Sequence, residues 1–426
     1  MVFFIIAISV ALFVLGFEMI IVLGFPSLLL HQAFFPTLPT EVLLQKMIAG
    51  MNHSTLMAIP FFVLAAETMA SGQIAKRLAG LMRVCIGHYR GGIGNTTVAT
   101  AMIFGSVSGS SPATVSAIGR LMYPQLRKAG YSDRFSVGLI SASAETSLLI
   151  PPSITMIIYG WLTGTSITKM FAAGLIIGLV LGLLFALYVY IESRRHDVGR
   201  LERVPMRERL GVIGEAAWAL GMPAIILGGI YTGMFTATEA ASISVIYALF
   251  VEAVIYREFS WSKLFDIFES AAVTTCVLFM LIGMGSILSF FLTLFQVPAM
   301  MISLIDALGG ELFVFLLLVN LGLILAGMFL DPSSAMLILV PALFPTAMAL
   351  GVDPVHFGMI VTLNIALGMI TPPFGLDIFV ASSTLNKPVA LVIRGIVPFV
   401  VVNLVALAAV TGFPVLSTFF PKLLGL

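Results

Sequence analysis

The chain has 426 residues, of which 60% are hydrophobic and only 10% are charged, and its mean hydropathy is +1.12. This composition excludes a soluble multidomain protein and is typical of an integral membrane protein. The formal net charge of +1 gives no reason to expect a nucleic-acid partner, and the isolated Cys85 and Cys276 predict neither a disulfide nor a metal cluster.

Charged residues are scarce enough to outline the loops, and an excess of Lys and Arg marks the loops on the cytoplasmic side. We expect crossings at residues 1–30 and 47–72, with the N-terminus in the cytoplasm. Two basic stretches follow and are both predicted to be cytoplasmic: Lys76, Arg77, Arg83 and Arg90, then Arg120, Arg127, Lys128 and Arg134. The uncharged residues 91–119 between them are too few to cross about 30 Å of hydrocarbon twice. They are therefore predicted to form a re-entrant hairpin that enters and leaves on the cytoplasmic side.

The middle of the chain continues this alternation. Residues 135–168 are expected to cross outward and residues 170–191 to return, ending at a basic arm over residues 192–209. The arm contains six arginines: Arg194, Arg195, Arg200, Arg203, Arg207 and Arg209. Residues 212–235 and 240–256 are predicted to form the next outward and inward pair.

The following segments lead to the outer side. Residues 257–269 predict an amphipathic helix at the inner surface, and the uncharged residues 270–305 are expected to cross outward. The next loop holds Asp306 and Glu311 without a base, which is typical of an outside loop. Residues 312–352 are therefore expected to leave and return on the outer side, and the internal repeat favours a second re-entrant hairpin over two thin crossings.

Residues 354–386 are expected to cross inward and residues 395–415 outward, which completes nine crossings and two hairpins. The predicted fold is an all-α polytopic membrane protein. Its expected parts are scaffold helices at 1–90, a first hairpin and broken helix at 91–168, further scaffold helices at 169–311, a second hairpin and broken helix at 312–386, and a C-terminal helix at 387–426.

The prolines reveal an internal repeat. Pro332 in the second predicted hairpin lies 220 residues after Pro112 in the first (332 − 112), and Pro372-Pro373 lies 221 residues after Pro151-Pro152 (372 − 151). Each proline pair interrupts the crossing that follows its hairpin, but the first hairpin opens inside and the second outside. Such inverted-topology repeats with broken helices are typical of secondary transporters.

Helices broken within a membrane leave backbone groups without partners, and in transporters ions and substrate satisfy them. Hydroxyls and backbone carbonyls near both breaks are hard oxygen donors, so an alkali ion or a proton is favoured over a transition metal. Small residues in membrane helices more often serve packing. Asp331 is a candidate site residue because an intramembrane acid is costly, although the Pro-Ser-Ser after it also fits a simple helix N-cap. For Glu145, pairing with a neighbouring helix and contact with the substrate fit the sequence equally well.

Several motifs resemble the large membrane subunit of tripartite ATP-independent periplasmic (TRAP) transporters. They are residues 91–95 (GGIGN), 108–114 (SGSSPAT), 150–153 (IPPS), 236–241 (TATEAA) and 370–375 (ITPPFG). The resemblance covers essentially the whole chain. It implies a Na⁺-driven importer of organic acids in the bacterial inner membrane, with an elevator-type moving domain made of the two hairpins and two broken helices. It also implies two partners, a small four-helix membrane subunit and a soluble periplasmic substrate-binding protein.

The resemblance further implies two Na⁺ sites, a substrate site and neither an organic cofactor nor enzymatic activity. The first Na⁺ site would involve Ser106, Ser108, Ser147, Ile150 and Pro152. The second would involve Gly327, Gly368, Thr371 and Pro372. The organic-acid substrate would contact Ser110, Ser153 and Asp331.

Other functions stay open on the sequence alone. A stand-alone Na⁺- or H⁺-coupled dicarboxylate carrier would share the fold without needing a binding protein. An intramembrane hydrolase would need a His beside a nucleophilic Ser, and the histidines are isolated. A pure channel fits the paired broken helices less well than alternating access does. Dicarboxylates, sialic acids, keto acids and sugar acids all remain candidate substrates.

Overall fold

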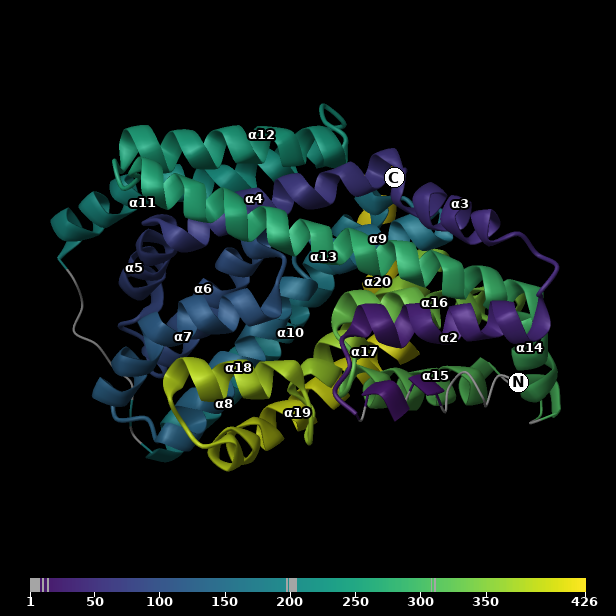
Figure 1. Cartoon of the computed structure of the whole chain (residues 1–426). Helices are drawn as coiled ribbons and strands as arrows, with labels where there is room; N and C mark the ends of the chain where they lie inside the picture. The colour runs from purple at the N-terminus through teal and green to yellow at the C-terminus, as the bar shows by residue number, and fades with distance from the viewer. Residues whose placement is uncertain are drawn as a thin grey trace.

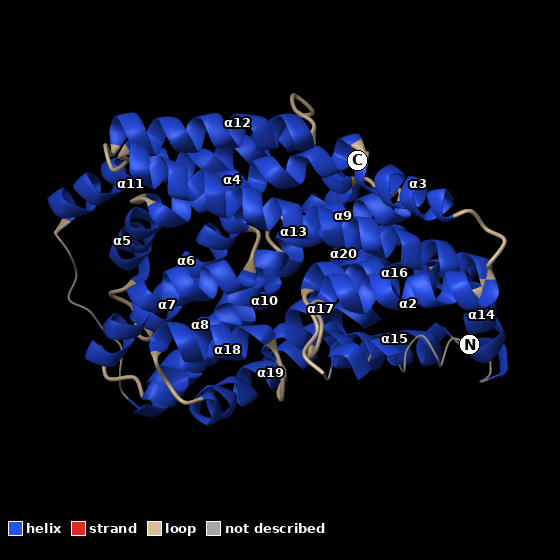
Figure 2. Cartoon of the chain, in the orientation of Figure 1, coloured by secondary structure: helices blue, strands red, loops and turns tan. Residues whose placement is uncertain are grey.

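The computed structural model describes residues 8–9, 11–13, 15–196, 198, 205–307, 309 and 312–426, and regular structure within these ranges is entirely helical (Figures 1 and 2). Seven of the described helical segments are long and apolar enough to cross a membrane, and five shorter apolar helices accompany them. The chain is therefore a multi-pass membrane protein, as its composition predicts. Arg200, Arg203, Glu311 and the side chain of Asp306 lie outside the described part.

The N-terminal elements are α2 (Met19–Phe34), α3 (Thr40–Met51), the 3₁₀ turn η1 (Ser54–Met57), α4 (Ala58–Ser71) and α5 (Ile74–Ile86). Residues 1–7, 10 and 14 of the crossing expected at residues 1–30 lie outside the described part, and the rest of it is not one continuous helix. A turn at residues 15–18 precedes α2, and Gly16 in it has a φ of +81°. Only glycine adopts this left-handed conformation at little cost, so an apolar run that looks continuous is divided there.

The first repeat comprises α6 (Gly92–Ser108), α7 (Ser111–Lys128), α8 (Asp133–Glu145), the 3₁₀ turn η2 (Thr146–Leu148), α9 (Ile154–Thr163) and α10 (Ile167–His196). Helices α6 and α7 form a helical hairpin with its turn at Gly109 and Ser110. Helices α8 and α9 are separated at Pro151-Pro152, since proline lacks the N–H that would continue a helix. Ser153 then caps α9 by accepting a hydrogen bond from the backbone N–H of Met156.

The central elements are α11 (Met206–Tyr231), α12 (Ala237–Phe250), the π-helical turn η3 (Val251–Ile255), α13 (Trp261–Leu294) and α14 (Val297–Ala307). The motif at residues 236–241 is a capping box, in which Thr236 and Glu239 satisfy each other's backbone N–H groups at the start of α12.

Helix α13 corrects two predictions. Residues 261–269 are the first turns of one 34-residue helix and not a separate surface helix, because nothing between Trp261 and Ile282 is a Gly or Pro that would break it. The expected crossing at 270–305 ends at Leu294, and Gln296 has a φ of +53° before α14 begins. The long helix therefore ends earlier in the chain than the charges suggest.

The second repeat comprises α15 (Leu312–Gly327), α16 (Pro332–Ala349), α17 (Pro354–Ile370), α18 (Leu376–Leu385), α19 (Val389–Gly412) and α20 (Val415–Leu423). Helices α15 and α16 form a second helical hairpin, and α17 and α18 are separated at Pro372-Pro373. The two repeats are intertwined. Helix α7 of the first repeat packs on α18 of the second, and α16 of the second packs on α9 of the first (Figure 1).

The repeats also meet through α8 and α19. A Cβ atom on Gly138 of α8 would lie 2.2 Å from the carbonyl oxygen of Gly395 in α19, so only glycine allows this backbone approach. Nearby, Asp133 accepts hydrogen bonds from Tyr123 Oη at 2.8 Å and from Lys387 Nζ at 3.2 Å. The Tyr123 hydroxyl holds the pKa of the half-buried Asp133 below its usual value. This cluster joins α7, α8 and the α18–α19 loop.

Candidate functional site

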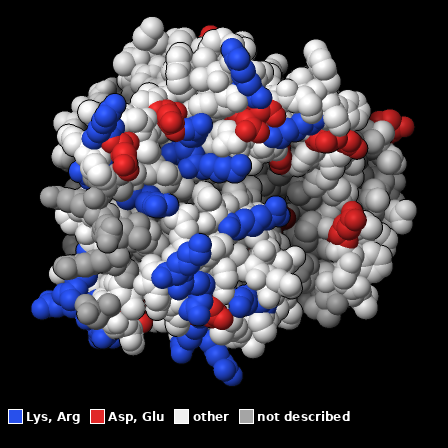
Figure 3. All heavy atoms as spheres, turned by 90° about the vertical axis from the view of Figure 1, so that its left-hand side faces the viewer, with Lys and Arg blue, Asp and Glu red and all other residues white. Residues whose placement is uncertain are grey.

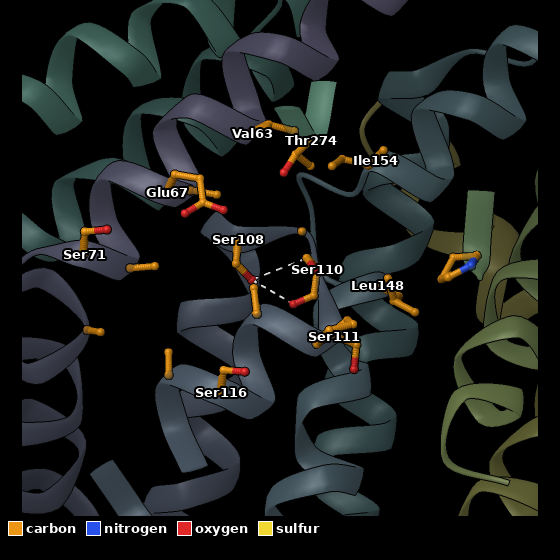
Figure 4. Close-up of a pocket in the computed structure, with 18 of the residues that line it drawn as sticks. Val63, Glu67, Ser71, Ser108, Ser110, Ser111, Ser116, Leu148, Ile154 and Thr274 are labelled. Carbon is orange, nitrogen blue, oxygen red and sulfur yellow. Dashed lines mark hydrogen bonds between the residues drawn. The ribbon is translucent and has the colours of Figure 1, made fainter. Parts of the chain in front are cut away.

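A cavity of about 760 Å³ lies where the tips of both hairpins approach α4, α5 and α13. Its walls come from α4, α5 and α13 on one side and from the first hairpin, residues 331–333 and Leu376 on the other. Glu67 and Ser71 of α4 face the hairpin tip that carries Ser108 and Ser110 (Figure 4). A space of this size accommodates a small molecule.

The tip of the first hairpin is held by its own side chains. Gly109 has a φ of +56°, which reverses the chain, and a Cβ atom there would lie 3.0 Å from the carbonyl oxygen of Pro152. The hydroxyl of Ser108 lies 2.8 Å from Thr114 Oγ1 and 3.3 Å from the carbonyl oxygen of Ser110. No side chain caps α7 at Ser110. The first N–H groups of α7 are therefore presented at the cavity without a side-chain acceptor.

The tip of the second hairpin differs, because Asp331 caps its helix. The carboxylate of Asp331 accepts hydrogen bonds from the backbone N–H groups of Ser333 at 3.0 Å and Ser334 at 3.1 Å, and from the Ser334 hydroxyl. Pro332 follows at the first helical position, which favours a helix start. Asp331 is thus the N-cap of α16, as one of its two interpretations predicts. The same residue also lines the cavity.

The first broken helix contacts the first hairpin directly behind the cavity. A Cβ atom on Gly105 would lie 2.7 Å from the Cα atom of Ser147. The Ser147 hydroxyl is fully buried there and has no hydrogen-bond partner among the described residues. Ser106, Ile150 and Pro152 are also buried beside this contact. The first contact therefore contains a buried hydroxyl that has no hydrogen-bond partner among the described residues.

The second broken helix makes the equivalent contact with the second hairpin. A Cβ atom on Gly368 would lie 2.5 Å from the Cα atom of Gly327, so the backbones of α15 and α17 touch. Thr371 donates its hydroxyl to the carbonyl oxygen of Leu367 at 2.6 Å, and Pro372 follows at the break. Gly327 lies 222 residues after Gly105 (327 − 105) and Gly368 lies 221 after Ser147 (368 − 147). The two contacts therefore occupy matching places in the repeats.

The predicted site residues fall into three groups. Ser108, Ser110 and Asp331 line the cavity. Ser153 does not line it, because its side chain is buried and caps α9. The remaining predicted residues lie at the two contacts between hairpin and broken helix: Ser106, Ser147, Ile150, Pro152, Gly327, Gly368, Thr371 and Pro372.

Three charged residues of the cavity wall are absent from the predicted site. Lys76 and Arg120 place two cations in the wall, and Glu67 places an acid there. The sequence predicts only that Lys76 and Arg120 lie in two cytoplasmic loops, because the distribution of charges does not show that these loops meet. Figure 3 shows Lys and Arg side chains gathered on the face where α5 and the end of α7 lie.

Glu145 is fully buried, and the structure identifies its partner. Asn403 of α19 donates a side-chain N–H to Glu145 Oε1 across the interface with α8. Of the two interpretations that the sequence leaves open for Glu145, the structure shows pairing with a neighbouring helix. This pairing satisfies one carboxyl oxygen, while Glu145 Oε2 and Asn403 Oδ1 have no partner among the described residues.

These features define a helical membrane protein of a transporter fold. The structure is similar to the crystal structure of the Alcanivorax borkumensis YdaH transporter, with a TM-score of 0.65 and 14% sequence identity over 95% of this chain and 98% of that one. At this level of identity the likeness shows the fold alone.

The family follows from the sequence comparisons. Residues 6–416 match the family described as tripartite ATP-independent periplasmic transporter, DctM component, and the chain belongs to this family. It is 39% identical over 415 residues to the ectoine/5-hydroxyectoine TRAP transporter large permease protein UehC of Ruegeria pomeroyi, covering 97% of each chain. It is also 39% identical over 381 residues to the C4-dicarboxylate TRAP transporter large permease protein DctM of Pseudomonas aeruginosa, covering 89% of each. The family predicted from the motifs is confirmed, and these relatives are permeases and not enzymes.

Proposed function

We propose that the chain is the translocating subunit of a Na⁺-coupled importer of a small organic acid, such as a C4-dicarboxylate or a sialic acid. The observation that carries this proposal is the pair of matching hairpin contacts, Gly105 with Ser147 and Gly327 with Gly368, behind one cavity. The relatives named for ectoine and for C4-dicarboxylates support a small solute as the cargo.

The substrate carboxylate is proposed to bind at the start of α7. Helix N-termini attract anions, and the N-terminus of α7 has no side-chain cap, whereas Asp331 already occupies that of α16. Lys76 and Arg120 add positive charge to the same cavity. Asp331 would then accept hydrogen bonds from substrate hydroxyls and would not face the carboxylate.

Two Na⁺ ions are proposed as co-transported cargo at the two contacts behind the cavity. The unsatisfied Ser147 hydroxyl fits a cation ligand at the first contact, and backbone oxygens near Gly327, Gly368 and Thr371 supply hard donors at the second. Na⁺ would supply positive charge beside the hairpin tips. The close contacts at Gly105 and at Gly327 with Gly368 would hold the ligand oxygens in place. Because the same hairpins line the cavity, ion binding would affect the position of the cavity wall.

The proposed transport step is an elevator movement of the two re-entrant hairpins and two broken helices against the scaffold. The cavity lies between these groups, with α4, α5 and α13 on the scaffold side. Its lining by Lys76 and Arg120 favours a cytoplasmic opening, which corresponds to an inward-facing state with the N-terminus in the cytoplasm. A small membrane subunit and a periplasmic binding protein are proposed as partners in the bacterial inner membrane, since relatives are named as permeases of TRAP transporters.

Replacing Ser108 or Thr371 by Ala should raise the Na⁺ concentration for half-maximal uptake about threefold to tenfold. The reason is that each change removes one polar contact, worth roughly 0.5–1.5 kcal/mol, near a proposed ion site. Uptake of a labelled C4-dicarboxylate into proteoliposomes holding the complete transporter measures this. Ser116→Ala is the matched control, because Ser116 lines the cavity on α7 away from both contacts. An unchanged Na⁺ titration in both variants would remove these residues from the ion sites.

A further inference from the structure

A fully buried acid lies directly behind the cavity wall and has no part in the proposed Na⁺ sites. Asp377 is the second residue of α18, and its relative exposure is 0%. Its neighbour Leu376 lines the cavity, and so does Ser111 at the start of α7. The Ser111 hydroxyl donates a hydrogen bond to Asp377 Oδ2, and it points in a different direction from the Ser110 side chain (Figure 4). One hydroxyl thus connects the acid to the hairpin tip.

Among the described residues no cationic side chain forms an ion pair with Asp377, and its carboxylate receives only the partial positive charge at the start of α18. The second carboxyl oxygen, Oδ1, is buried without a hydrogen-bond partner in the same part of the chain. A buried carboxylate with one hydroxyl donor is strongly disfavoured unless a positive charge neutralises it. Glu145, which is also fully buried, lies within electrostatic range of Asp377 and adds repulsion.

The other titratable groups around α18 are engaged elsewhere or face the cavity. Helices α7, α8, α17 and α19 pack against α18. Tyr123, Arg127 and Lys387 bind Asp133, Arg134 donates to the carbonyl oxygen of Arg394, and His356 binds Ser417. Arg120 faces the cavity, Lys128 and Arg394 are exposed, and Glu145 binds Asn403. The smallest cation, a proton, is therefore the charge that suits this enclosed position.

We propose that Asp377 is a proton-binding residue, loaded from the cavity past Ser111, whose protonation state controls how firmly the first hairpin tip is held against α18. The hydrogen bond from Ser111 is charge-assisted when Asp377 is ionised and weaker when the acid is neutral. Proton binding therefore loosens the contact between α7 and α18, and proton release tightens it. This inference goes beyond the proposed function, which assigns Na⁺ to other residues, and its test needs no transport substrate.

Infrared difference spectroscopy of the full-length chain in lipid, between about pH 6 and about pH 9, tests the proposal. Exposed carboxyl groups with ordinary pKa values near 4 are ionised throughout this range, so they do not contribute. The wild type should lose a carboxylic-acid C=O band as the pH rises, and Asp377→Asn should lack that component. Glu145→Gln and Glu252→Gln, which remove the other two described acids whose relative exposure is 0%, should each retain it. Loss of the band in Glu145→Gln or Glu252→Gln with its retention in Asp377→Asn would overturn the proposal.

A second variant keeps the test decisive if Asp377→Asn does not fold. Ser111→Ala removes the one donor that stabilises the ionised form, so the midpoint of the same band should shift to higher pH. An unshifted midpoint would contradict the link to the hairpin tip. The titration is also repeated with and without NaCl at constant ionic strength. If Na⁺ abolishes the carboxylic-acid band at every pH, an alkali ion occupies this position and the proton assignment is wrong.

Discussion

Asp331→Ala should reduce uptake by at least about tenfold, which corresponds to about 1.4 kcal/mol or more of lost interaction. The substitution removes the acceptor of the Ser333 and Ser334 N–H groups at the tip of the second hairpin. It also removes the proposed partner of substrate hydroxyls from the cavity wall. Uptake of the labelled acid by the reconstituted transporter, compared with thermal unfolding of the same preparation, separates these two effects.

Asp353→Ala is the matched control for this variant. Asp353 caps α17 in the same way, accepting from the N–H groups of Val355 at 2.9 Å and His356 at 3.0 Å, but it does not line the cavity. Loss of either cap should cost about 0.5–2 kcal/mol of stability. Only Asp331→Ala should lose transport. Equal transport by the two variants would limit Asp331 to a capping role.

Gly368→Ala should abolish Na⁺-dependent uptake, because its Cβ atom would lie 2.5 Å from the Cα atom of Gly327. Backbone atoms cannot rotate away as a side chain can, so α15 and α17 must separate at the second proposed Na⁺ site. Overpacking of this kind typically costs about 1–3 kcal/mol in stability. The predicted loss of transport exceeds what this destabilisation explains, and uptake per folded molecule is therefore the quantity to measure.

The control for this substitution is Gly322→Ala, in the helix that carries Gly327. A Cβ atom on Gly322 meets nothing within 4 Å, and alanine is favoured over glycine in a helix by about 1 kcal/mol. This variant should fold and transport as well as the wild type. Retained Na⁺-dependent uptake by Gly368→Ala would show that the contact between α15 and α17 does not shape an ion site.

The sequence predicts those parts of the fold that depend on local chemistry. The proline pairs at matched offsets predict that helices are interrupted near residues 151–152 and 372–373, since a proline lacks the N–H that would continue a helix. Asp331 followed by Pro332 likewise predicts a helix start. Helix α13 was wrongly divided, because the distribution of charges locates the membrane surface but does not determine whether a helix continues through it.

The parts that depend on tertiary contacts are not visible in the sequence. Ser111 and Asp377 are 266 residues apart and Asn403 and Glu145 are 258 apart, yet each pair shares a hydrogen bond. Arg120 belongs to a basic stretch whose charges indicate a loop, whereas in the folded chain this residue lines the cavity. Long-range packing of α7 on α18 and of α8 on α19 decides these roles.

Uptake of labelled C4-dicarboxylates and sialic acid into proteoliposomes tests the central claim most directly. The vesicles hold this chain with its small membrane partner, and the Na⁺ gradient and the cognate periplasmic binding protein are omitted one at a time. We expect uptake to require both the Na⁺ gradient and the binding protein and to stop when either is missing. Uptake of the same acid by this chain without the binding protein would contradict this expectation and would identify a stand-alone carrier.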